Sequence, residues 1–178
     1  MIFKSVDSIL KPDPRFANLC VVENGVARRI TLADHHTALA GISLIDLVPR
    51  DVRAAFDRAR NATIYAFFDY DLFVVGEMQV FGALELALKW RLRGSGSASR
   101  STLRKLVGRA RKAGVLPPLA PGANALLDPI EALIELRNAL SHGTSDIHSP
   151  GMAFDVIESC AFWINHVCSP GCDKGADE

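Results

Sequence analysis

The sequence has no apolar run long enough to cross a bilayer and no net charge, and both absences limit what it can do. Its 178 residues hold 20 Lys and Arg against 20 Asp and Glu, while 49% are hydrophobic and 22% charged. These are ordinary proportions for a globular protein. The start of the chain lacks the charged and then apolar segments of a secretory signal. We expect one domain with its own core, in the cytoplasm and outside membranes.

Signatures of cofactor-dependent and metal-dependent enzymes are also absent. The sequence has no glycine-rich phosphate loop followed by Lys and Ser or Thr, no dinucleotide fingerprint and no His-Glu-x-x-His site. Its four cysteines lack the spacing of a disulfide framework, so we expect reduced thiols. Cys160, Cys168 and Cys172 lie near His166. Their spacing matches no zinc finger or ribbon, and buried thiols before a frayed end explain them better. We predict no metal and no cofactor.

The N-terminal part of the chain favours a β-hairpin. Asn24-Gly25 lies between the β-prone residues 18–22 and 26–32, and this arrangement is a strong hairpin signal. Residues 1–48 are therefore predicted to form a small β-hairpin extension packed on a helical body. Two adjacent histidines follow the hairpin, and we take them as surface residues whose side chains point apart: His35 and His36.

The rest of the chain has the apolar spacing of helices, so we predict a mainly α protein. Five helical segments are expected: from Pro49 onward, from Asp69 or Asp71 to Arg93, from Ser99 or Ser101 to Gly114, from Asp128 to Ser141, and from Met152 to Val167. The second is apolar nearly all round, as expected at the centre of a bundle or in an oligomer interface. Residues 169–178 are predicted to be a flexible tail.

A basic segment is hidden by the neutral total. Nine basic residues and no acidic one lie between Lys89 and Lys112. Three of them share one helix face at i, i+4 and i+7: Lys105, Arg109 and Lys112. This face either guides an RNA backbone by charge or is a solvated surface. No aromatic residue interleaves in the basic helix, so base stacking is not indicated there.

The run Arg137-Asn138-Ala139-Leu140-Ser141-His142 closes an apolar helix and has the most chemical content. A guanidinium holds phosphate through a planar fork of donors, and an imidazole carries a proton near neutral pH. On a helical wheel Arg137 falls in the middle of the apolar face, while Asp128, Glu131 and Glu135 gather on the solvated side.

A guanidinium on an apolar face must be paired or open into a polar cleft. Glu77 is the first candidate partner, because phenylalanines occupy its i−4 and i+4 positions and it has no local basic neighbour. Glu85 is the weaker candidate, because Lys89 at i+4 is already placed to form an ion pair with it. We predict that Glu77 or Glu85 approaches Arg137. The alternative is a structural arginine tied to a buried carboxylate.

His142 lies about 140° from Arg137 on a regular helix. The two side chains converge only if the helix loosens at residues 141–143 or if two chains share the site. Taken alone, His142 fits equally a cation that eases the dipole at a helix C-terminus. Asn138, one turn before His142, is placed to orient the imidazole or to donate to a phosphate oxygen.

The run matches the Arg-Asn-x-x-x-His motif of the HEPN superfamily, small helical domains that include many RNA-cleaving toxins and defence nucleases. The chain resembles that family over residues 49–168, in the motif and in the order of its helices. The resemblance implies an up-and-down helical bundle and a homodimer whose paired motifs meet in a cleft. It also implies metal-independent RNA cleavage by the RNA's own 2′-hydroxyl.

In that interpretation Arg137, Asn138 and His142 are catalytic, and Glu77 and Ser141 support them. The basic face guides the RNA, DNA is not cut, and an antitoxin protein is a possible partner. The main alternative is a non-catalytic HEPN-like module that binds a nucleotide or another protein. A third, weaker class is a purely structural dimerisation protein.

Overall fold

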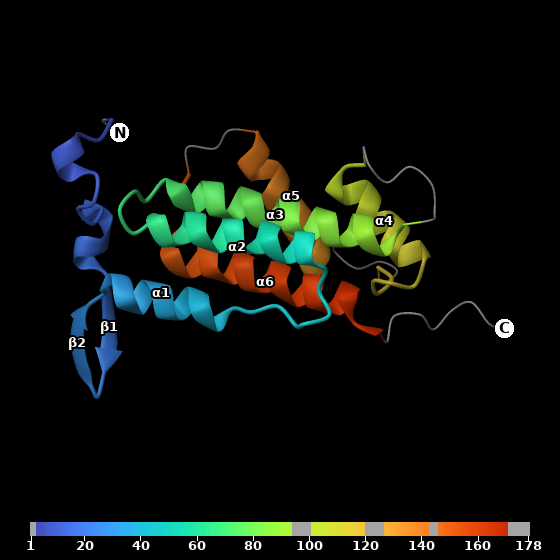
Figure 1. Cartoon of the computed structure of the whole chain (residues 1–178), viewed down its shortest axis with the longest axis horizontal. Coiled ribbons are helices and arrows are strands. Elements are labelled where there is room, and N and C mark those ends of the chain that lie inside the picture. Colours follow the sequence, from blue (N-terminus) through green and yellow to red (C-terminus); the bar gives the residue numbers. More distant parts are fainter. Residues whose placement is uncertain (1–2, 94–100, 120–126, 143–145, 171–178) are drawn as a thin grey trace.

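The computed structural model describes residues 3–93, 101–119, 127–142 and 146–170. They form a mainly helical protein with one two-stranded antiparallel hairpin near the N-terminus, as predicted (Figure 1). The elements in chain order are the 3-10 helices η1 (Val6–Ser8) and η2 (Pro14–Asn18), the strands β1 (Cys20–Glu23) and β2 (Val26–Arg29), and the helices α1 (Leu32–Gly41), α2 (Arg50–Tyr65), α3 (Leu72–Arg91), α4 (Leu103–Lys112), α5 (Pro129–Ser141) and α6 (Pro150–Cys168). None of the described helices is long and apolar enough to span a membrane.

The hairpin lies where the Asn-Gly signal placed it. Strands β1 and β2 pair in antiparallel register with Glu23 opposite Val26. Asn24 and Gly25 connect them with φ angles of 51° and 79°. Both angles are in the left-handed region, which a two-residue turn between twisted strands requires and which Asn and Gly adopt most easily.

Helix α3 lies at the centre of the bundle, as its apolar surface predicted. It packs along α2 and α6 and also contacts α4 and α5 (Figure 1). Gly76 allows the close approach of α2: a Cβ at this position would lie 2.1 Å from the Thr63 hydroxyl oxygen. Burial of apolar side chains on both sides of α3 is therefore the main contribution to the fold.

The expectation that both adjacent histidines lie on the surface was wrong for His35. Residues 32–41 form α1, which the sequence analysis did not predict, and His35 faces inward with 2% of its surface exposed. Its Nε2 lies 2.8 Å from the Thr63 carbonyl oxygen. Its ring packs among phenylalanines of η2, α3 and α6 and of the segment after α2: Phe16, Phe67, Phe73 and Phe154. The N-terminal segment thus covers one end of the helices. Of the two adjacent histidines, His35 is buried and His36 is exposed.

The expectation that the acidic side of α5 is solvated was wrong for Glu131, although Glu135 is exposed. Helix α4 packs against this side, and Glu131 is only 8% exposed. Arg104 contacts Glu131 at 2.9 Å and Glu135 at 2.5 Å. Arg111 contacts Asp128 at 2.9 Å and Glu131 at 3.4 Å. Two arginines of the basic segment are therefore paired between helices, because the charges of α4 and α5 are complementary.

Candidate active site at the end of helix α5

The motif occupies the last two turns of α5, and the start of this helix is well fixed. The Asp128 carboxylate accepts hydrogen bonds from the backbone N–H groups of Ile130 and Glu131, and Pro129 holds the first helical position. The helix ends at Ser141, as predicted, and His142 is its C-cap. Gly143, proposed to terminate it, lies outside the described residues.

Two contacts hold the motif turns beside α3. Arg137 Nη2 lies 3.5 Å from Glu85 Oε1. One turn later, the Ser141 hydroxyl lies 3.9 Å from the sulfur of Met78. Since the residue number rises along α5 while it falls along α3, the two helices run in opposite directions. The motif side chains therefore follow the surface of α3 from Glu85 toward its N-terminal turns.

The prediction that Glu77 or Glu85 approaches Arg137 is confirmed for Glu85. The Arg137 side chain is 30% exposed, so it is neither sealed in the core nor freely solvated. Glu85 also lies 3.7 Å from Lys89 Nζ and is shared between two cations. Glu77, the first candidate, has another partner.

The other motif residues differ in how they are held. Asn138 is half-buried, whereas Ser141 and His142 are exposed. The Ser141 hydroxyl donates to the Arg137 carbonyl oxygen at 2.7 Å. The His142 N–H reaches the carbonyl oxygens of Asn138 and Ala139 at 3.1 and 3.3 Å, so the helix tightens in its last turn. The described structure has no side-chain contact between His142 and Arg137, and the two do not converge within one chain.

A buried glutamate of α3 pairs with a histidine that precedes α6, and the sequence did not predict this pair. Glu77 is completely buried, and its Oε1 lies 2.7 Å from Nδ1 of His148, whose side chain is 17% exposed. Burial raises the pKa of Glu77, while the hydrogen bond to His148 opposes the rise. Glu77 was recognisable as a carboxylate without a local cation. Its partner was not, because His148 precedes α6 and reaches Glu77 only through the tertiary fold.

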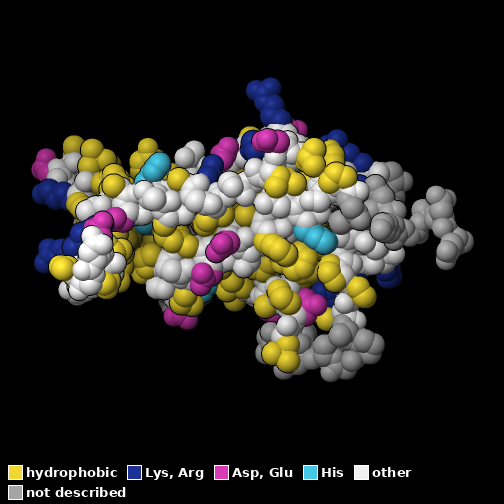
Figure 2. All heavy atoms as spheres, turned by 90° about the horizontal axis from the view of Figure 1, so that it is seen from below, with side chains coloured by type: hydrophobic (Ala, Val, Ile, Leu, Met, Phe, Trp, Pro, Cys, Tyr) yellow, Lys and Arg dark blue, Asp and Glu magenta, His cyan; other side chains and the backbone are white. Residues whose placement is uncertain are grey.

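The predicted RNA-binding face on α4 lies apart from the motif. Helix α4 flanks the first turns of α5 through Arg104 and Arg111, whereas the motif occupies the last turns. Lys105 and Lys112 are exposed and have no ion-pair partner among the described residues, and Arg109 is half-buried. On the face shown in Figure 2, hydrophobic side chains lie across the middle, and most Lys and Arg side chains lie toward the rim, interspersed with acidic ones. That face offers no continuous basic track.

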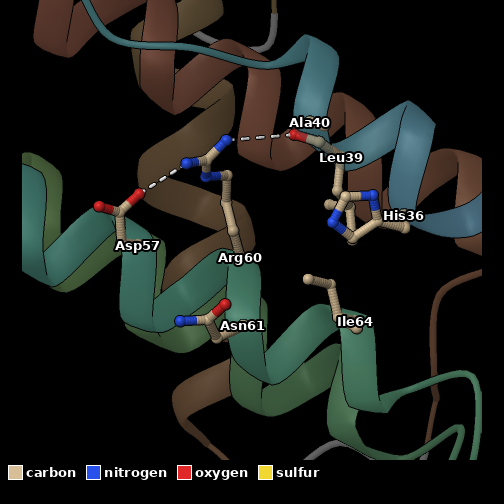
Figure 3. A pocket seen from close by; sticks show the side chains of 7 residues that line it. All are labelled: His36, Leu39, Ala40, Asp57, Arg60, Asn61 and Ile64. Atoms are coloured by element: carbon tan, nitrogen blue, oxygen red, sulfur yellow. Dashed lines mark hydrogen bonds and ion pairs between the residues drawn. The ribbon is translucent and has the colours of Figure 1, made fainter.

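A pocket of about 330 Å³ opens between α1 and α2, away from the motif. It is lined by His36, Leu39, Ala40, Asp57, Arg60, Asn61 and Ile64 (Figure 3). The Arg60 guanidinium donates to the carbonyl oxygens of Leu39 and Ile42 and, at 2.7 Å, to Asp57. This arginine therefore satisfies the C-terminal end of α1 instead of facing an empty anion site.

The cysteines near the C-terminus are structural where the structure describes them. Cys160 and Cys168 are buried free thiols, and burial raises the pKa of both. His166 Nε2 lies 3.2 Å from the Val115 carbonyl oxygen. Cys172 lies outside the described residues. Within the described part of the chain, no three His, Cys, Asp or Glu side chains are grouped as a metal ion would need.

No protein-family model, no curated protein and no solved structure matches this chain. The HEPN resemblance therefore rests on the motif and on the order of the helices.

Proposed function

We propose that the chain is a HEPN-like, metal-independent endoribonuclease of the toxin or phage-defence type, active as a homodimer in the cytoplasm. The observation that carries the proposal is the end of α5. There a guanidinium whose side chain is 30% exposed lies 3.5 Å from a carboxylate, five residues before an exposed imidazole. Arginine suits a scissile phosphate, and histidine suits proton transfer.

The chemistry proceeds by attack of a ribose 2′-hydroxyl on the adjacent phosphorus. The 2′-oxygen–phosphorus bond forms, the bond from phosphorus to the 5′-oxygen breaks, and a 2′,3′-cyclic phosphate and a 5′-hydroxyl result. His142 accepts the proton of the 2′-hydroxyl, and the leaving 5′-oxygen takes up a proton from a second imidazole, which the motif of the partner chain would offer in a dimer. Arg137 binds the phosphoryl oxygens, whose charge rises in the transition state, and Asn138 adds an amide donor. DNA lacks the attacking hydroxyl and is not cleaved.

A dimer is part of the proposal because His142 is exposed and does not meet Arg137 in its own chain. A two-fold axis beside the last turn of α5 would bring the imidazole of one chain to the guanidinium of the other. Lys105, Arg109 and Lys112 on α4 would then contact RNA beyond the cleaved linkage by charge alone.

One observation favours the second candidate, a non-catalytic HEPN-like module that binds a nucleotide or a protein. Arg137 has an acidic neighbour in Glu85, and the Ser141 hydroxyl is used within the helix. In that case Arg137 holds α5 against α3, and the chain does not cleave RNA.

The decisive experiment incubates the purified chain with a mixed-sequence RNA in the presence of EDTA. Wild type should cleave, and Arg137→Ala or His142→Ala should each reduce the rate by about 10²–10⁴-fold. The matched controls are Arg58→Ala and His36→Ala, which remove exposed side chains of α2 and α1 and should keep wild-type rates.

Replacement of the 2′-hydroxyls by hydrogen should abolish cleavage by wild type. A pure wild-type protein that leaves RNA intact would refute the enzyme and favour the binding module. Cleavage that survives both motif substitutions would place the activity elsewhere in the chain.

A further inference from the structure

The buried carboxylate of Glu77 destabilises the fold, and the motif gives no reason for its presence. The other buried carboxylates that the structure describes have arginine partners: Asp13 contacts Arg15 at 2.9 Å, and Glu131 contacts Arg104 and Arg111. Glu77 has only the His148 imidazole, and its second oxygen, Oε2, is buried without a hydrogen-bond partner in the described structure. A carboxylate desolvated in this way destabilises a core that leucine or methionine would fill better.

We propose that His148, held by Glu77, is the general acid of the ribonuclease site and protonates the leaving 5′-oxygen. This inference rests on the proposed ribonuclease function and adds a catalytic residue outside the motif. Glu77 is its positioning residue, because it acts on the substrate only through the imidazole. Each chain then supplies two imidazoles, His142 and His148, and the acid need not come from a second copy of the motif.

The position of His148 suits this role. Glu77 is adjacent to Met78, which contacts Ser141 at the end of the motif helix. Eight residues, or about 12 Å of helix, separate Glu77 from Glu85 beside Arg137. His148 and Arg137 are thus anchored to the same helix on either side of the motif's last turn.

The backbone around His148 is also well fixed. The next residue, Ser149, caps α6 by accepting a hydrogen bond from the Met152 N–H, and Pro150 is buried at the first helical position. His142, in contrast, is an exposed C-cap. A rigidly held imidazole is what proton transfer in a defined direction needs.

The hydrogen bond fixes which nitrogen reacts. With Nδ1 against the carboxylate, Nε2 is the nitrogen left for substrate, and it has no partner among the described residues. In the reaction Nε2 gives its proton to the 5′-oxygen as the bond to phosphorus breaks. Nδ1 keeps its own proton, which stays hydrogen-bonded to Glu77. His142 receives the 2′-hydroxyl proton, so the site gains one proton and loses one.

The test compares two RNA oligomers of one sequence, one with oxygen and the other with sulfur at the 5′-bridging position of the cleaved linkage. A thiolate leaves without protonation, so only the oxygen substrate needs the acid. His148→Asn should slow the oxygen substrate by about 10²–10⁴-fold and the sulfur substrate by less than about tenfold. His142→Asn should slow both, and His36→Asn neither. Glu77→Gln should repeat the His148→Asn pattern with a smaller loss.

Equal slowing of both substrates by His148→Asn, or slowing of neither, overturns the inference while the ribonuclease stands. A wild-type chain that cleaves neither oligomer overturns the proposed function and this inference with it. If a variant does not fold, NMR of the wild-type chain still tests the inference. The ring ¹⁵N shifts of neutral His148 should show the proton on Nδ1, and a proton on Nε2 contradicts the assignment.

Discussion

Replacing Gly76 with alanine should push α2 and α3 apart where Thr63 faces Gly76. The added Cβ would lie 2.1 Å from the Thr63 hydroxyl oxygen and 3.3 Å from the Ala59 carbonyl oxygen. Thr63 has no room to turn away freely, because it is fully buried and its hydroxyl donates to Ala59 at 2.9 Å. Overpacking of this kind costs about 1–3 kcal/mol, and loss of the hydroxyl bond about 1 kcal/mol more.

Alanine also gains about 1 kcal/mol over glycine as a helix former. The net expectation is a free energy of unfolding lowered by about 1–3 kcal/mol, measured by urea denaturation followed by circular dichroism. Gly82→Ala is the matched control on the same helix: a Cβ there meets nothing within 4 Å, so it should stabilise by up to about 1 kcal/mol.

Thr63→Ala removes the oxygen that clashes and should recover part of the loss when combined with Gly76→Ala. In the wild-type background the same change only destabilises, because it removes the hydroxyl bond to Ala59. This difference in sign separates a steric contact from a general weakening of α3. A Gly76→Ala protein as stable as Gly82→Ala would refute the close-contact argument.

Three further measurements test the electrostatics. Burial lowers the pKa of His35 below its ordinary 6.5, so the unfolded chain binds this proton first and stability falls as pH drops below about 6.5, by at most about 1.4 kcal/mol per pH unit. Urea unfolding across this range should show that term lost in His35→Phe and kept in His36→Asn; equal slopes would contradict it. Arg111→Met removes the arginine partner of half-buried Asp128 and one of the two arginine partners of buried Glu131, and should lower the free energy of unfolding by about 3 kcal/mol. Lys105→Met on the exposed side should change it by less than about 0.5 kcal/mol; similar losses would contradict the inter-helix network. RNA affinity should fall with rising salt, and the negative slope of log K against log salt should become smaller in magnitude by about 0.7 when Lys112→Ala removes one phosphate contact; an unchanged slope would exclude this contact.

The sequence predicted turns and helix ends well where they depend on the conformational preferences of a few neighbouring residues. The Asn24-Gly25 turn, the Asp128-Pro129 helix start and the end at Ser141 depend on backbone preferences of the residues themselves. Helix α1 was missed although a local signal exists. Thr31 and Asp34 form a capping box at its start, each side chain bonding the other's backbone N–H. The burial of His35 depends on the segments that cover α1, so it could not be predicted from the neighbouring residues in the sequence.

Predictions about the candidate site were incomplete or wrong where they depended on how helices align. The helical wheel indicated that Arg137 needs a carboxylate, and α3 provides one. Whether that carboxylate is Glu77 or Glu85 depends on the register of α3 against α5, which periodicity within one helix does not specify. Glu131 was assigned to solvent for the same reason: the wheel gives a direction, and only the packing of α4 determines what lies there.

The contrast between Arg137 and Arg111 argues that the motif arginine is not simply another inter-helix tie. Arg111 lies 2.9 and 3.4 Å from two carboxylates, and only 11% of its side chain is exposed, so it is paired inside the fold. The Arg137 contact of 3.5 Å exceeds an ordinary N–H···O distance, and its carboxylate partner keeps a second cation at 3.7 Å in Lys89. A phosphate that draws Arg137 away therefore leaves Glu85 still paired. The bundle holds this guanidinium beside α3 without saturating its donors, as the proposed binding of an RNA phosphate requires.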